Sequence, residues 1–131
     1  MRAMAHDHDA NPLARHGGLS YLEIPTVDAA KSGAFYRELF GWQVDARTPT
    51  DYRFSDDNGL LIGRFVPSNA PAREPGFLPF VYVDSVDAAL ARAVTHGGEV
   101  ATPPYAEGDL RVAKVRDPSG NLVGLWQFAK P

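Results

Sequence analysis

The chain reads DDNGLLIG at Asp56–Gly63 and DPSGNLVG at Asp117–Gly124, at a constant offset of 61 residues. Each stretch passes from turn residues into an apolar strand, which is typical of a β-hairpin. Each also follows a strand-like and then a helix-like segment, in the same order. A repeat of this length indicates two copies of one supersecondary unit. We therefore expect two related modules that face each other across a cleft.

The first module is expected over about residues 17–66. Asp28 is suited to cap a helix, and Gly41 is suited to end it in a left-handed conformation. Ala34, Phe35 and Leu39 form the apolar stripe of that helix. Alternating or apolar residues before and after the helix predict strands at 19–25 and at about 42–47, 52–55 and 59–66.

A linker with three prolines separates this module from the second, at about residues 67–76. Ser85 or Asp84 is expected to cap the second helix, which ends before Gly97 and Gly98. Strands are predicted at 77–84, about 99–102, 110–116 and 121–128. The pattern is βαβββ twice, an α+β fold in which each helix covers one face of a sheet.

Length and composition predict one globular domain, over residues 17–131, and the absence of a secretory signal favours the cytoplasm. The chain has 131 residues, 44% of them hydrophobic, a formal net charge of −3 and no cysteine. Disulfides and thiolate metal sites are therefore excluded, and without a basic cluster nucleic-acid binding is not expected. No stretch has the length and apolarity of a membrane span, and the polar residues 1–16 predict a flexible tail without the features of a secretory signal. His6 and His8 in this tail leave metal binding there open as an alternative.

Strand alternation assigns side chains to two faces of each module. Leu22 and Ile24 are expected to meet the first helix, and Val81 and Val83 the second. The opposite faces are then rich in aromatic rings, and an apolar face needs a ligand or another subunit to cover it. The candidate ligand-binding residues on those faces are Tyr21, Glu23, Gly63, Phe80, Tyr82, Gly124 and Trp126.

Three segments together resemble the vicinal oxygen chelate superfamily, which includes glyoxalase I, bleomycin and fosfomycin resistance proteins and extradiol dioxygenases. They are Ala34–Trp42, Val81–Leu90 and Arg116–Asn121, within a resemblance that covers about residues 18–128. The resemblance implies paired βαβββ modules in a half-open barrel, often in homodimers. It also implies a divalent metal held by His, Glu or Gln on the first and last strands of each module.

This chain departs from the family at the metal positions, which fall on Tyr21, Leu78, Gly63 and Gly124. Leucine and glycine side chains have no donor atom, and a neutral tyrosine is a poor lone ligand. The sequence thus predicts a member with no metal or other cofactor. The resemblance implies that such members are mostly binding proteins, some of which sequester a drug, or proteins of unknown role.

Each candidate residue also has a structural interpretation. Glu23 is expected to accept a hydrogen bond from a ligand or act as a base, and otherwise to be a solvated carboxylate at the rim. Tyr21, Tyr82 and Trp126 are expected to stack on a ligand, and otherwise to pack in the core. The remaining candidates are two arginines that could pair with an anionic ligand, Arg53 and Arg64, and two histidines expected to be structural, His16 and His96.

We therefore expect a metal-independent protein that binds a small apolar or aromatic molecule in the cleft between its modules, as a homodimer. One alternative is a lyase, isomerase or dioxygenase of this superfamily that uses a divalent metal. The other is an interaction module whose aromatic face is only a dimer interface. The sequence does not identify the ligand.

Overall fold

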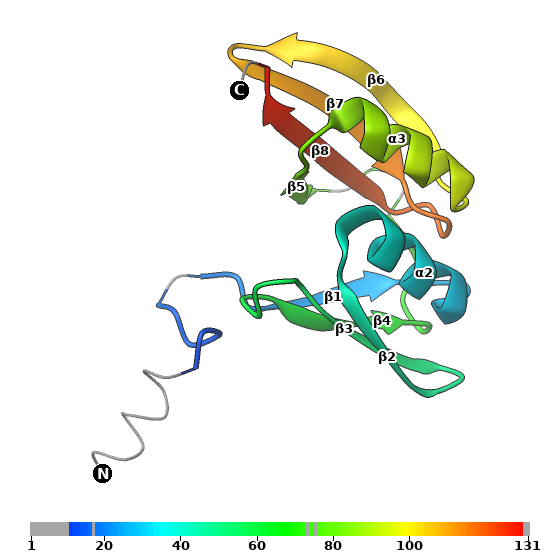
Figure 1. The fold of residues 1–131 in the computed structure, drawn as a ribbon. Coiled ribbons are helices and arrows are strands. Elements are labelled where there is room, and N and C mark those ends of the chain that lie inside the picture. The colour runs from blue at the N-terminus through cyan, green and yellow to red at the C-terminus, as the bar shows by residue number, and fades with distance from the viewer. Residues whose placement is uncertain (1–10, 17, 73, 75, 130–131) are drawn as a thin grey trace.

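The computed structural model describes residues 11–16, 18–72, 74 and 76–129 and shows two modules of the same design (Figure 1). Each module has one helix and one mixed four-stranded sheet, which confirms the predicted α+β class with two βαβββ-like modules. The first module contains β1 (Tyr21–Pro25), α2 (Ala29–Phe40), β2 (Gln43–Thr48), β3 (Asp51–Ser55) and β4 (Ile62–Val66). The second contains β5 (Phe80–Tyr82), α3 (Val86–Thr95), β6 (Glu99–Glu107), β7 (Leu110–Arg116) and β8 (Leu122–Phe128).

The two sheets have equivalent strand orders. Sheet A runs β1-β4-β3-β2 and sheet B runs β5-β8-β7-β6. In each sheet the first strand pairs in parallel with the last, and the other pairs are antiparallel. Strand β6 is longer than predicted and includes Pro103 and Pro104, with register irregularities around them. An edge strand tolerates proline because one side of its backbone has no partner strand.

Local sequence explains where both helices begin and where α2 ends. Asp28 and Ser85 have extended backbones, and their side chains accept hydrogen bonds from the Lys31 and Ala88 amides at 3.2 and 3.1 Å. Ser85 is thus the cap of α3. Gly41 follows α2 with φ 74°, a left-handed conformation that costs glycine little. The predicted caps of both helices are confirmed.

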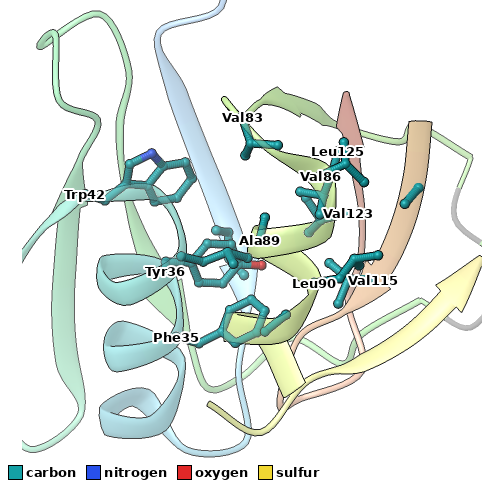
Figure 2. Packing of buried hydrophobic residues seen from close by; sticks show 14 of the residues in the cluster. Phe35, Tyr36, Trp42, Val83, Val86, Ala89, Leu90, Val115, Val123 and Leu125 are labelled. Carbon is teal, nitrogen blue, oxygen red and sulfur yellow. The ribbon is translucent and has the colours of Figure 1, made fainter. Parts of the chain in front are cut away.

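Both helices lie between the two sheets, and they share one hydrophobic core (Figures 1 and 2). Phe35 and Tyr36 of α2 are buried beside Ala89 and Leu90 of α3. Each helix therefore contacts its own sheet on one side and the other module on the other side. Of the residues predicted to meet the helices, Ile24 and Val83 belong to this core, and Leu22 and Val81 are partly buried and pack against it.

This arrangement corrects the expectation that the helix-free faces of the two sheets enclose a cleft within one chain. A separate hollow of about 370 Å³ does lie between the modules, bordered by Phe40, Trp42, Val81 and Tyr82 among others. The helices occupy the space between the modules, so the helix-free faces of sheets A and B lie on opposite sides of the chain. Alternation along a strand predicts which side chains meet a helix. It does not predict what contacts the far side of that helix, which here is the other helix.

A buried polar network joins the modules at the turn that precedes β8. The carboxylate of Asp117, 3% exposed, accepts hydrogen bonds from the Tyr36 hydroxyl at 2.9 Å and from the side-chain amide of Asn121 at 2.8 Å. The same amide donates to the Pro25 carbonyl at the end of β1, at 2.7 Å. The turn residues therefore connect the start of β8 to the first module, in addition to forming the hairpin.

Tyr36 predicts a specific loss of stability at alkaline pH. Burial, the charge of Asp117 and the hydrogen bond to it raise the pKa of Tyr36 well above its ordinary value. The stabilisation is complete below pH 10, the unfolded pKa, and is lost as pH rises from there towards the folded pKa. We expect the free energy of unfolding to fall by up to about 1.4 kcal/mol per pH unit from this group.

The Tyr36→Phe variant isolates this contribution, because it lacks only the titrating hydroxyl. At pH 7 it should cost about 1 kcal/mol, since Asp117 keeps its other donors. Urea titrations followed by circular dichroism between pH 8 and 11.5 should show a shallower decline for this variant. Parallel pH profiles for the two proteins would contradict the prediction.

Candidate functional site

The hairpin turns before β4 and β8 differ in length by one residue. The Asp56 amide donates to the carbonyl of Leu61 at 2.9 Å, whereas the Asp117 amide donates to that of Asn121 at 2.8 Å. The first turn therefore has one more residue between its hydrogen-bonded ends. Because side chains alternate between the faces of a strand, one extra residue reverses the face of every position that follows.

The reversal corrects the predicted position of Gly63. Gly63 pairs with Leu22 and Phe54, so it lies on the helix-facing side of sheet A, whereas Gly124 pairs with Phe80 on the outer side of sheet B. The position in sheet A that corresponds to Gly124 is Arg64. Equivalent residues at the start of the two turns are 61 positions apart, whereas equivalent residues of β4 and β8 are 60 positions apart.

The outer face of sheet B, which we call the aromatic face, carries four rings from β5 and β8. The Tyr82 and Trp126 rings lie edge to face with centroids 5.0 Å apart, and Trp126 and Phe128 do the same at 5.3 Å. Phe80 lies over Gly124, where a Cβ atom would collide with its ring. The exposed fractions of Phe80, Tyr82 and Phe128 are 46, 48 and 56%, so the rings form an open apolar surface.

The outer face of sheet A, which we call the arginine face, is polar instead. A row across its four strands contains Glu23, Arg64, Arg53 and Asp45, each a register partner of the next. A shallow hollow of about 370 Å³ beside this row is bordered by Tyr21, Gln43, Arg47, Arg53, Ser55 and Ile62, among others. Gly63 also borders it, through its main chain.

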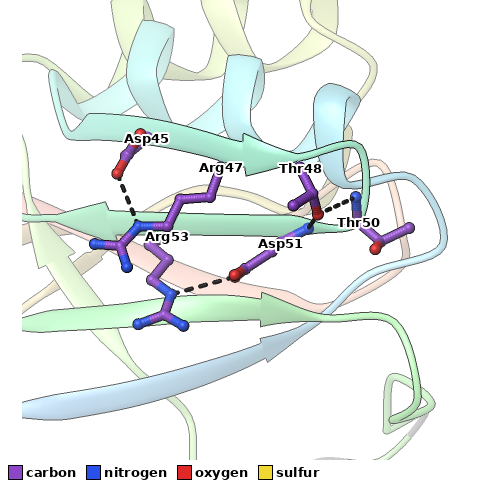
Figure 3. A network of polar contacts seen from close by, with 6 residues as sticks. All are labelled: Asp45, Arg47, Thr48, Thr50, Asp51 and Arg53. Atoms are coloured by element: carbon purple, nitrogen blue, oxygen red, sulfur yellow. Dashed lines mark hydrogen bonds and ion pairs between the residues drawn. The ribbon is translucent and has the colours of Figure 1, made fainter.

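Ion pairs orient two of these arginines (Figure 3). The Nε atom of Arg47 donates to Asp45 at 3.0 Å, and that of Arg53 donates to Asp51 at 3.2 Å. The hydrogen bond to Asp51, together with the charge of Asp51, raises the pKa of Arg53. The Arg53 hydrogen bond in turn lowers the pKa of Asp51, as do the charges of Arg53, Arg64 and Arg47. This face thus holds oriented guanidinium groups, together with the carboxylates of Glu23, Asp45 and Asp51, next to a hollow.

The structure places the seven candidate residues on three surfaces. Tyr21 and Glu23 lie on the arginine face, and Phe80, Tyr82, Gly124 and Trp126 lie on or under the aromatic face. Gly63 lies on the helix-facing side. The sequence analysis did not select Arg47 or Gln43. Both lie at alternate positions of the strand that neighbours Arg53, and this alternation would have placed them on the same face as Arg53.

Potential metal ligands are dispersed over the described part of the chain. No group of three or more His, Cys, Asp or Glu side chains there is arranged to hold a metal ion. Glu23 is the one carboxylate on β1, and its register partner is Arg64. His6 and His8 lie outside the described residues. Among the described residues, no helix has the length and apolarity needed to cross a membrane.

The paired modules, with open outer faces, define a protein of the glyoxalase-like fold. The sequence model of the Glyoxalase/Bleomycin resistance protein/Dioxygenase superfamily matches residues 18–125, so the chain belongs to this superfamily. It is 32% identical to the "Putative glyoxylase CFP32" of Mycobacterium tuberculosis (strain CDC 1551 / Oshkosh), over 86% of this chain and 46% of that protein. It is 28% identical to the anthracycline biosynthesis protein DnrV of Streptomyces peucetius, over 85% and 47%. The chain thus spans about half the length of these curated relatives.

Solved structures share the fold over nearly their whole length. A family enzyme from Burkholderia phytofirmans PsJN superimposes with a TM-score of 0.68 at 24% identity, covering 84% of this chain and 98% of that one. TnmS3, an antibiotic binding protein from Streptomyces sp. CB03234, gives 0.64 at 27% identity, covering 86% and 96%. The first likeness shows the fold alone.

Proposed function

We propose that this chain binds a small apolar or aromatic molecule without a metal. The aromatic face supports the proposal most directly, because it leaves three large rings about half exposed beside Trp126. Ligand sites of this kind combine aromatic walls with a few polar groups, and exposed rings gain free energy when a planar molecule covers them. The description of TnmS3 as an antibiotic binding protein agrees with a binding role.

We infer that the cleft forms between two copies of the chain. The outer faces of one chain point away from each other, so neither wall can close over a ligand within that chain. In a homodimer, the arginine face of one copy can lie opposite the aromatic face of its partner. Two-fold symmetry then produces two identical clefts. Arginine side chains opposite aromatic rings are also favourable neighbours.

The binding proposal predicts that Trp126→Ala weakens the binding of a planar uncharged probe. With 2-naphthamide in equilibrium dialysis, the dissociation constant should rise about tenfold because one stacking wall is lost. Phe77→Ala is the matched control, since Phe77 is 98% exposed and precedes the strand. Equal binding by Trp126→Ala and the unchanged protein, or no saturable binding by the latter, would contradict the proposal.

The two-copy cleft is tested by mixing two defective variants. Tyr21→Ala removes a side chain from the arginine face, and Trp126→Ala removes one from the aromatic face. In a mixed dimer, one cleft combines the two unaltered faces and should bind 2-naphthamide with the original affinity. Sedimentation should show dimers. If subunit exchange restores no binding, or if the protein is monomeric, the cleft is not shared between copies.

A further inference from the structure

The two arginines at the centre of the arginine face lie side by side. In the order β1-β4-β3-β2, Arg64 of β4 and Arg53 of β3 occupy the two central strands and are register partners. The acidic residues of the same row, Glu23 and Asp45, lie on the two edge strands. Like charges directly opposite each other destabilise an antiparallel pair. Within the chain this repulsion is countered by Glu23 beside Arg64, by Asp45 beside Arg53 and by the ion pair between Arg53 and Asp51.

The hydrogen-bonding capacity of both guanidinium groups is incompletely used. The Nε atom of Arg64 is buried and has no hydrogen-bond partner, and its side chain forms no ion pair with any described residue. Arg53 binds Asp51 through Nε, and its two terminal nitrogens donate no hydrogen bond within the described chain. A buried donor without a partner is unfavourable. An acceptor from outside the chain would relieve both this cost and the repulsion.

A carboxylate is the acceptor that fits these donors. A guanidinium group presents two parallel N–H bonds, and a carboxylate accepts them with its two oxygens. We propose that the molecule bound by this protein carries a carboxylate, which Arg53 and Arg64 bind while its apolar part lies on the aromatic face of the second copy. This inference rests on the proposed function and adds the chemical class of the ligand.

Neighbouring groups are arranged to support this role. Asp51, the first residue of β3, accepts a hydrogen bond from the Arg53 guanidinium and so fixes its orientation (Figure 3). Arg53 also borders the hollow that Tyr21 lines, so a bound carboxylate has space beside it. Glu23 and Asp45 are the negative charges of the row, and both lie on edge strands of the sheet, exposed to solvent.

The test compares two probes that share a ring system and differ in charge. The unchanged protein should bind 2-naphthoate about tenfold more tightly than 2-naphthamide, because charge-assisted hydrogen bonds are stronger than neutral ones. Arg64→Gln and Arg53→Gln should each remove most of this preference and leave 2-naphthamide binding within about twofold. Arg37→Gln, which removes a positive charge from an exposed part of α2, should leave both affinities unchanged.

The failures of the two proposals are distinguishable. Equal affinity for both probes, or equal losses for both in the Arg53 and Arg64 variants, would overturn the carboxylate inference while the small-molecule function stands. Absence of binding by either probe would overturn both. Salt provides a measurement that needs no variant: 0.5 M NaCl should weaken 2-naphthoate binding and spare 2-naphthamide. Thermal unfolding of Arg64→Gln should occur at or above the original temperature, because the repulsion is removed.

Discussion

Gly63→Ala is expected to lower the free energy of unfolding by about 3 kcal/mol, at the upper end of the usual cost of overpacking. A Cβ atom at Gly63 would collide with the carbonyl oxygen of Leu22, a main-chain atom of the neighbouring strand β1. It would also meet the ring of Phe54, which is buried between Trp42 and Phe65. Neither neighbour can move without separating β1 from β4 or disturbing the core.

Gly124→Ala is the matched control, because the sequence repeat aligns Gly124 with Gly63. A Cβ atom there meets the ring of Phe80, with its Cγ atom at 2.7 Å. Phe80 is half exposed, so its ring can rotate into solvent, and the expected cost is about 1 kcal/mol. Urea unfolding of both variants at pH 7 measures the difference. Similar costs for the two substitutions would contradict the assignment of Gly63 to the helix-facing side of sheet A and of Gly124 to the outer side of sheet B.

Much of the fold could be predicted because its determinants are local. Asp28, Ser85 and Gly41 cap the helices through contacts with residues three or four positions away. Leu22, Ile24, Val81 and Val83 meet the helices as strand alternation requires. The doubled order of elements followed from the repeat alone. Patterns within stretches of about ten residues were therefore enough to predict the helices and strands and the helix-facing side of each sheet.

Two features depended on information that local patterns do not contain. The hydrogen bond from Asp56 to Leu61 lengthens one turn by a residue, and apolar residues at positions 60–62 fit either register. The packing of α2 against α3 brings together residues that are far apart in the sequence, so no local pattern predicts it. Alternation therefore predicted Tyr21, Glu23, Tyr82 and Trp126 on outer faces correctly, and it failed for Gly63. Whether these residues bind a ligand stays a prediction.

Asp117→Ala is expected to cost about 4 kcal/mol of folding free energy, in the range for breaking a buried charged network. The carboxylate accepts four hydrogen bonds: from the Ser119 and Asn121 amides, each at 2.9 Å, and from the side chains of Tyr36 and Asn121. Alanine would leave the Tyr36 hydroxyl without its acceptor at a position that is 2% exposed. The turn would open at the same time, because its own amides lose their acceptor.

Asp56→Ala measures the part of this cost that belongs to the turn alone. Asp56 occupies the equivalent place in the first module, and its carboxylate accepts from the Leu60 and Leu61 amides at 2.9 and 3.2 Å. It is half-buried and has no side-chain donor among the described residues, so its loss should cost about 1 kcal/mol. Urea unfolding at pH 7 should therefore separate the two variants by about 3 kcal/mol. If they unfold at the same urea concentration, the link from Asp117 to Tyr36 adds nothing to the stability of the junction between the modules.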